Sequence, residues 1–187
     1  MRLFNWGEIE SMLNKKAQVW LETVLYTLIG LVLVGMVLAF VMPKINEVKD
    51  RTLVEQAITT LSLLDEKINE VLQKGAGNTR EADFMMKRGE IYFNMSNDEI
   101  VFVLTGLTKP YSEPGIEIEQ GRIKILSTQK GKTSETYLKL KYNANLTYLN
   151  KDDLKKLTAA PTPYKIFVEN RGILNGKEWI EIEEASD

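Results

Sequence analysis

The sequence predicts an α+β protein, in which a long N-terminal helix precedes a C-terminal head of antiparallel β-strands. Three observations lead to this fold class. Residues 23–42 are apolar and uncharged, residues 54–71 repeat apolar side chains at helical spacing, and beyond residue 80 apolar and polar side chains alternate. Alternation is typical of antiparallel strands that bury one face. We therefore expect a helix whose first half spans a membrane and whose amphipathic second half packs on the head.

The composition excludes several kinds of chemistry. The 187 residues include 24 Lys and Arg, 26 Asp and Glu, no His and no Cys. Without Cys there are no disulfides, thiolate-bound zinc or Cys-ligated iron–sulfur clusters, and without His there is no Ser-His-Asp catalysis. The net charge of −2 gives no reason to expect nucleic acid, whose binding depends on clustered cations. We expect a protein that is not an enzyme and has no cofactor, catalytic residue or metal site.

The apolar run from Thr23 to Met42 contains 20 residues without a charge. As a helix it would be about 30 Å long, the thickness of a bilayer's hydrocarbon core. The alternative is the core helix of a soluble domain, which is usually shorter and keeps a polar stripe. No small-x-small cleavage site follows Met42, so we expect the run to stay attached. Basic residues on both sides leave its orientation undecided by the positive-inside rule.

The residues just before this run carry a second pattern. Lys15, Lys16, Ala17 and Gln18 are followed by Glu22 and then by the apolar helix. This order resembles the class III signal peptide of archaeal type IV pilins and archaellins. In that family a prepilin peptidase cuts after a small residue preceded by basic ones, usually before Gln, and Glu stands fifth in the mature chain.

The resemblance covers roughly residues 15–50 and implies a pilin-like architecture. It implies a leader peptide over residues 1–17, a cut between Ala17 and Gln18, and a pairing of Glu22 with the N-terminal amine of a neighbouring subunit. The alternative for Glu22 is a helix-end charge that reaches the headgroups and favours the positive end of the helix dipole. The start of translation, at Met1 or Met12, stays open.

The resemblance also implies a function, a location and partners. The chain would be a structural subunit of a type IV pilus-like surface filament or pseudopilus, with its N-terminus cytoplasmic and its head extracytoplasmic. Its partners would be membrane lipid before assembly, prepilin peptidase, and other pilin-like subunits. Roles in adhesion, motility and secretion all stay open. The rival hypothesis is an uncleaved single-span anchor that presents a binding module outside the cell.

We divide the rest of the chain into a transmembrane and assembly helix (18–42), an amphipathic helix (43–79) and a β-rich head (80–187). Two series of apolar residues, each with a spacing of seven, mark the amphipathic helix: Val54, Leu61, Ile68 and Ala57, Leu64, Val71. Such a stripe favours a helix packed on its own sheet over a coiled-coil seam. Gly75 and Gly77 supply the usual termination of a helix.

The head is expected to hold seven or eight short strands. The expected strands are 90–95, 99–104, 116–119, 122–126, 136–142, 145–148, 164–169 and 178–183. We also expect a helical turn at 151–157, a loop at 159–163 and a turn at 170–172. Two sequons, at Asn94 and Asn145, are candidate N-glycosylation sites.

Overall fold

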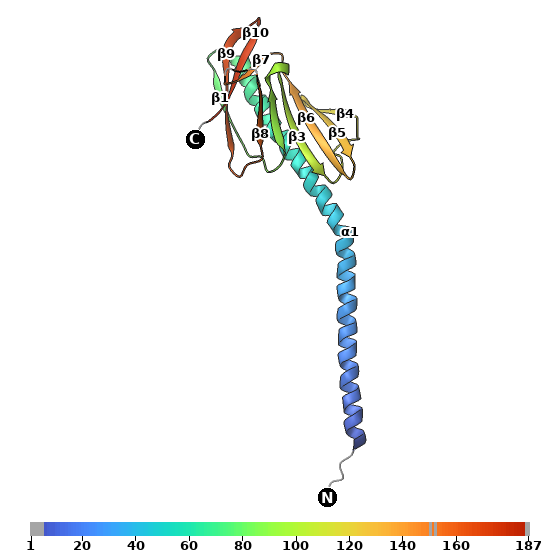
Figure 1. Ribbon diagram of the computed structural model, residues 1–187. Coiled ribbons are helices and arrows are strands. Elements are labelled where there is room, and N and C mark those ends of the chain that lie inside the picture. Colours follow the sequence, from blue (N-terminus) through green and yellow to red (C-terminus); the bar gives the residue numbers. More distant parts are fainter. Residues whose placement is uncertain (1–5, 150, 152, 186–187) are drawn as a thin grey trace. The chain divides into compact units, whose positions relative to one another are not determined.

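The computed structural model describes residues 6–149, 151 and 153–185, and side chains from residue 18 onward. The chain divides between Ile45 and Asn46 into two compact units. One helix, α1 (Trp6–Lys74), runs through both and continues past Pro43 without a break (Figure 1). The predicted long apolar N-terminal helix and the β-rich C-terminal domain are both confirmed, and the fold is α+β.

The C-terminal end of α1 is well terminated. Gly75 takes the left-handed conformation, with φ of +79°, and its N–H donates to the carbonyl of Val71 at 3.1 Å. The Asn78 side-chain amide donates to the carbonyls of Lys74 and Gly75, both at 3.0 Å. These bonds satisfy carbonyls that have no partner within the helix. The helix therefore ends where the glycines predict.

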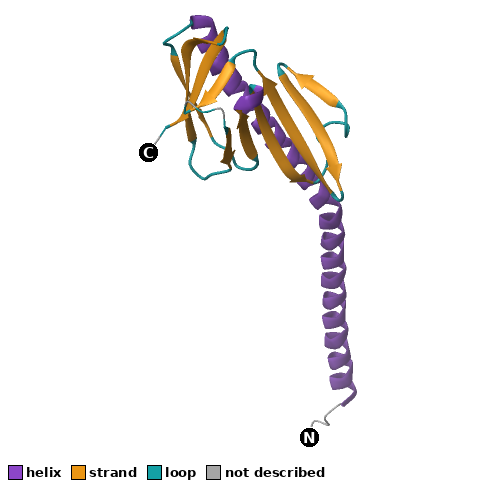
Figure 2. Ribbon diagram, turned by 45° about the horizontal axis from the view of Figure 1, so that its top comes forward, coloured by secondary structure: helices purple, strands orange, loops and turns teal. Residues whose placement is uncertain are grey.

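The apolar stripe on the second half of α1 lies in the core of the head. Its six residues are all buried, with exposures of 0–2%: Val54, Ala57, Leu61, Leu64, Ile68 and Val71. They belong to one hydrophobic cluster with core residues of both sheets, such as Phe93 and Val168. The stripe therefore packs within its own chain, which confirms the choice of a sheet-packed helix over a coiled-coil seam (Figure 2).

Two sheets make up the rest of the head. The four-stranded sheet has the order β1 (Thr79–Phe84), β9 (Tyr164–Leu174), β10 (Lys177–Glu184), β7 (Asn145–Tyr148). The six-stranded sheet has the order β4 (Glu117–Gln120), β5 (Ile123–Lys130), β6 (Thr133–Lys141), β3 (Glu99–Leu107), β2 (Glu90–Asn94), β8 (Leu154–Thr158). A 3-10 turn, η1 (Met95–Asn97), connects β2 and β3.

The expected helical turn at 151–157 is wrong. Leu154–Thr158 is strand β8, which pairs antiparallel with β2 and sets Leu157 opposite Ile91. The leucines at 154 and 157 are spaced as in a helix, but pairing with β2 buries Leu157 and satisfies the backbone of the strand. Tertiary pairing has overridden the local pattern.

The expected turn at 170–172 is also wrong. Strand β9 continues to Leu174, and the turn to β10 comes at Asn175 and Gly176. The glycine that suggested a turn, Gly172, has φ of +103° and lies where the register between β9 and β10 shifts. It marks an irregularity within a long hairpin.

Three further features of the head were not predicted. Strand β1 was not predicted, since it buries only Ala82 and Phe84, too few apolar residues to reveal an alternation in the sequence. With β1 and β8, the described residues contain ten strands, where seven or eight were expected. One strand pair, β10 with β7, is parallel, whereas the others are antiparallel as expected.

Asn170 joins the end of α1 to the four-stranded sheet. It is fully buried, and its side-chain amide donates to the carbonyl of Val71 at 3.1 Å and to Glu178 at 3.0 Å. Its side-chain oxygen accepts a hydrogen bond from the backbone N–H of Gly172 at 2.8 Å. Its backbone carbonyl accepts one from the backbone N–H of Gly77 at 2.7 Å. One side chain thus satisfies polar groups of both the helix end and the hairpin.

We predict that Asn170→Ala lowers the free energy of unfolding by about 2–4 kcal/mol, since it leaves buried partners without hydrogen bonds. Asn143→Ala, at an exposed position, is the matched control and should change it by less than about 0.5 kcal/mol. Chemical unfolding of the full chain in detergent micelles, followed by circular dichroism, measures both. Equal stability of the two variants would contradict the role given to Asn170.

Candidate assembly helix and the contacts of its second half

From residue 18 to residue 42, α1 exposes its apolar side chains. The helix is long and apolar enough to cross a membrane, and none of its most apolar stretch is buried by the rest of the chain. Tyr26 is 72% exposed and Phe40 is 80% exposed. Exposed apolar surface costs about 25 cal/mol per Å² in water, so a continuous surface of this kind needs lipid or protein around it. Its length and composition fit a membrane anchor.

The hydroxyls of this segment are satisfied within the helix. The hydroxyl of Thr23 donates to the carbonyl of Val19 at 2.8 Å, and that of Thr27 donates to the carbonyl of Thr23 at 2.7 Å. Such back-bonding lets a hydroxyl enter lipid without a second chain. These threonines therefore do not call for a polar partner.

Glu22 is less well satisfied than the threonines. Its exposed carboxylate accepts a hydrogen bond from the Gln18 side-chain amide one turn earlier, at the long distance of 3.4 Å. Gln18 and Glu22, the two predicted site residues that follow the expected cut, thus contact each other. Lys15, Lys16 and Ala17 continue the backbone of α1, but their side chains lie outside the described residues.

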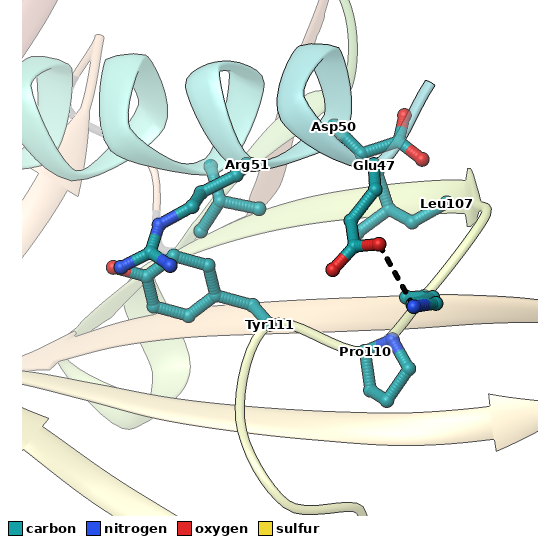
Figure 3. A pocket seen from close by; sticks show the side chains of 8 residues that line it. Glu47, Asp50, Arg51, Leu107, Pro110 and Tyr111 are labelled. Carbon is teal, nitrogen blue, oxygen red and sulfur yellow. Dashed lines mark hydrogen bonds and ion pairs between the residues drawn. The ribbon is translucent and has the colours of Figure 1, made fainter. Parts of the chain in front are cut away.

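In the head, the first turns of the second half of α1 are held by the segment after β3. Glu47 pairs with Lys109 at 2.8 Å, and Asp50 accepts a hydrogen bond from the N–H of Thr108. The Arg51 guanidinium lies 6.0 Å from the centre of the Tyr111 ring (Figure 3). These contacts surround a cavity of about 160 Å³. Its carboxylates and cations neutralise one another, so we interpret it as a structural clamp.

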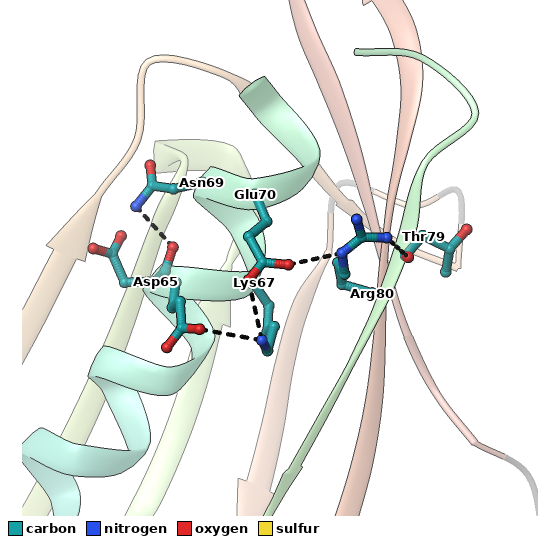
Figure 4. A network of polar contacts seen from close by, with 7 residues as sticks. Asp65, Lys67, Asn69, Glu70, Thr79 and Arg80 are labelled. Carbon is teal, nitrogen blue, oxygen red and sulfur yellow. Dashed lines mark hydrogen bonds and ion pairs between the residues drawn. The ribbon is translucent and has the colours of Figure 1, made fainter. Parts of the chain in front are cut away.

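A second set of polar contacts fastens the last turns of α1 to β1. Glu70 pairs with Arg80 at 2.7 Å and with Lys67 at 3.2 Å, and Arg80 also donates to the carbonyl of Thr79 at 2.7 Å (Figure 4). The hydrogen bond from Arg80, followed by that from Lys67, lowers the pKa of Glu70 below its ordinary value of 4.5. The ionised form of Glu70 is therefore favoured by the fold.

The six-stranded sheet is fastened to the same helix through Asp65. Its carboxylate pairs with Arg122 at 2.8 Å and accepts a hydrogen bond from the Tyr142 hydroxyl at 3.0 Å. Arg122 also donates to the side chain of Asn69 at 2.9 Å. Burial, with the nearby Asp65 charge, raises the pKa of Tyr142. The hydroxyl therefore stays protonated and remains the donor.

Both candidate glycosylation sites lie in strands. Asn94, in β2, donates to Glu99 at 3.3 Å, and Asn145, in β7, donates to the carbonyl of Leu174. Both residues are half-buried. Their modification stays a prediction.

The sequence did not single out Asn170, Asp50 or the Glu70–Arg80 pair. Asn170 was assigned only to an expected turn, and pairs of charges far apart in the sequence give no local signal. Among the described residues there is no group of three or more Asp, Glu, His or Cys side chains placed to hold a metal ion. The chain matches no protein-family model, no curated protein and no solved structure.

We predict that Glu70 makes the head lose stability at acidic pH. The pKa of Glu70 is lowered in the folded state. The stability that the ionised carboxylate contributes is therefore present above the ordinary pKa of 4.5, and it is lost as the pH falls through that value toward the folded pKa. Glu70→Gln should therefore reduce the loss of thermal stability between about pH 6 and pH 3. Melting temperatures by circular dichroism across this range test it.

Glu113→Gln, at an exposed carboxylate in the segment before β4, is the matched control for that measurement. It should leave the acid-side loss as it is in the unmodified chain. If both variants follow the unmodified chain across the pH range, the pairing of Glu70 with Arg80 does not stabilise the fold.

Proposed function

We propose that this chain is a structural subunit of a type IV pilus-like surface filament or pseudopilus. One observation carries the proposal: α1 exposes an apolar surface over its first half and forms the core of a folded head with its second half. The first half needs a surrounding of lipid or other helices, whereas the head is already complete. Assembly through the N-terminal helix supplies that surrounding without unfolding the head.

Processing by a prepilin peptidase is the step that would release the subunit from its leader. The cut between Ala17 and Gln18 would give Gln18 a free amine, one helical turn from Glu22. In a low-dielectric environment a charge pair is far stronger than in water, and an unpaired carboxylate is costly. A neighbour's amine would therefore compensate Glu22 better than the long bond from Gln18 does.

The same scheme gives the orientation of the chain. Lys15 and Lys16 would stay cytoplasmic before cleavage, and the head would fold outside the membrane. Packing between helices would form the filament core, with the head facing solvent.

We predict that the mature protein begins at Gln18. Intact-mass and N-terminal analysis of protein purified from native membranes or filaments should show the loss of Met1–Ala17, or of the shorter leader from Met12. Ala17→Phe should retain the leader, because the resemblance implies a small residue at the cut. Asn14→Phe, which lies in the leader whether translation starts at Met1 or at Met12, should be processed normally. An intact leader in the unmodified protein would instead support the uncleaved anchor.

We predict that Glu22→Ala permits membrane insertion and prevents filament assembly. Removing the carboxylate lowers the cost of insertion and abolishes the pairing with a neighbouring amine. Thr27→Ala is the matched control, since its hydroxyl bonds only to its own helix among the described residues. Membrane fractionation and electron microscopy of cells separate the two effects. If Glu22→Ala cells form normal filaments, Glu22 is not needed for assembly and serves only as a charge at the end of the helix.

A further inference from the structure

Strand β4 forms one edge of the six-stranded sheet (Figure 1). It buries none of its side chains. All four residues of Glu117–Gln120 are exposed. Ile118 is 38% exposed, and Ile116, just before the strand, is 49% exposed. The paired neighbours on β5, Ile123 and Ile125, are buried. The apolar surface of the sheet thus continues outward beyond the part that the rest of the head covers.

The backbone of β4 also presents hydrogen-bonding groups outward. β4 and β5 are joined by a two-residue turn in which Gly121 has φ of +62°, as the first residue of a type II′ turn requires. The pair that flanks such a turn, Gln120 and Ile123, is hydrogen-bonded, and bonded pairs alternate along an antiparallel ladder. The N–H and C=O groups of Glu117 and Glu119 therefore face away from β5.

The side chains of β4 define what can lie beside it. Ile118 pairs with Ile125 on one face, and Glu119 pairs with Lys124 on the other. The Lys124 ammonium lies 2.9 Å from Glu117 and 3.6 Å from Glu119. One cation is thus shared by two carboxylates, which leaves a net negative charge along the strand.

A second β4 is a poor neighbour for this edge. Antiparallel pairing of β4 with its copy would place Glu117 and Glu119 of one chain next to those of the other, and like charges at such positions are destabilising. The strand that β4 already accepts shows the opposite chemistry. In β5 and the turn before it, cations and isoleucines alternate in the order Arg122, Ile123, Lys124, Ile125.

We propose that the free edge of β4 is a docking site for an extended segment of a partner protein in which apolar residues alternate with Lys or Arg. The segment adds a seventh strand to the sheet. Its backbone bonds to Glu117 and Glu119, its apolar side chains cover Ile116 and Ile118, and its cations meet the two carboxylates. Backbone pairing gives affinity and alternate side chains give specificity, as in strand addition elsewhere.

The test uses a synthetic peptide with the sequence of residues 122–128, Arg-Ile-Lys-Ile-Leu-Ser-Thr, labelled with a fluorophore. Titrated with the full chain in detergent micelles, it should bind with a dissociation constant below about 1 mM, as read by fluorescence anisotropy. A peptide with Glu in place of Arg and Lys should bind at least tenfold more weakly. The proposal is overturned if the basic peptide does not bind with a dissociation constant below about 1 mM.

Two variants decide whether the binding occurs at β4. The double substitution Glu117→Lys, Glu119→Lys should exchange the preference, so that the acidic peptide binds tighter than the basic one. Glu119→Pro removes an outward-facing N–H, spares the bonds to β5, and should weaken the basic peptide at least tenfold. Circular dichroism checks that each variant folds. If the proline variant does not fold, the charge-reversed variant alone decides whether the peptide binds at β4.

The remaining outcomes count against the proposal. Equal binding of the basic peptide to the charge-reversed chain would show attraction to other acidic surfaces. Concentration-dependent association of the unmodified chain that Glu119→Pro abolishes would show that a second copy occupies the edge.

Discussion

The fold of the head depends on the burial of one apolar stripe. Val54, Leu61, Ile68 and the three residues interleaved with them lie on the same face of α1 and reach the cores of both sheets. Each fully buried aliphatic side chain contributes about 1.5–3 kcal/mol relative to an exposed one. Because both sheets use the same helix face, neither could keep its core if the stripe were polar. The helix therefore supplies one face of the single hydrophobic core that both sheets share.

The polar contacts around the stripe contribute more to register than to free energy. Exposed ion pairs contribute little to the free energy of folding because water screens them, and Lys109–Glu47 is of this kind. Their arrangement is nevertheless specific. Along α1, Glu47 contacts the segment after β3, Asp65 contacts Arg122 beside β5, and Glu70 contacts Arg80 in β1. Apolar burial holds the sheets against the helix, and these contacts fix where along the helix each sheet lies.

The sequence predicted those parts of the fold whose signal is periodic and local. A spacing of seven located the stripe, and strict alternation located β3, β5 and β6. It failed where a tertiary contact decides the conformation. Leu154 and Leu157 are spaced as in a helix yet belong to a strand paired with β2, and the Asn170 to Gly172 segment resembles a turn yet lies within β9. Strand β1 buries only Ala82 and Phe84, so its apolar alternation is too short to be recognised in the sequence. For the candidate site, the sequence located Gln18 and Glu22, whose contact spans one helical turn, but not Asn170, whose partner Val71 is 99 residues away.

In the proposed filament, the contrast between Glu22 and the threonines after it bears on how subunits would find their register. Apolar side chains between Val24 and Met42 can pack on a neighbouring helix in many axial positions, since dispersion contacts are similar at each. Thr23 and Thr27 add little discrimination, because their hydroxyls are already bonded to their own helix. A carboxylate in low dielectric differs, since its free energy depends strongly on whether a cation lies within a few ångströms. Glu22 would thus select one axial position from many that the apolar surface allows, and the absence of any other charge between residues 23 and 42 is what would make that selection unambiguous.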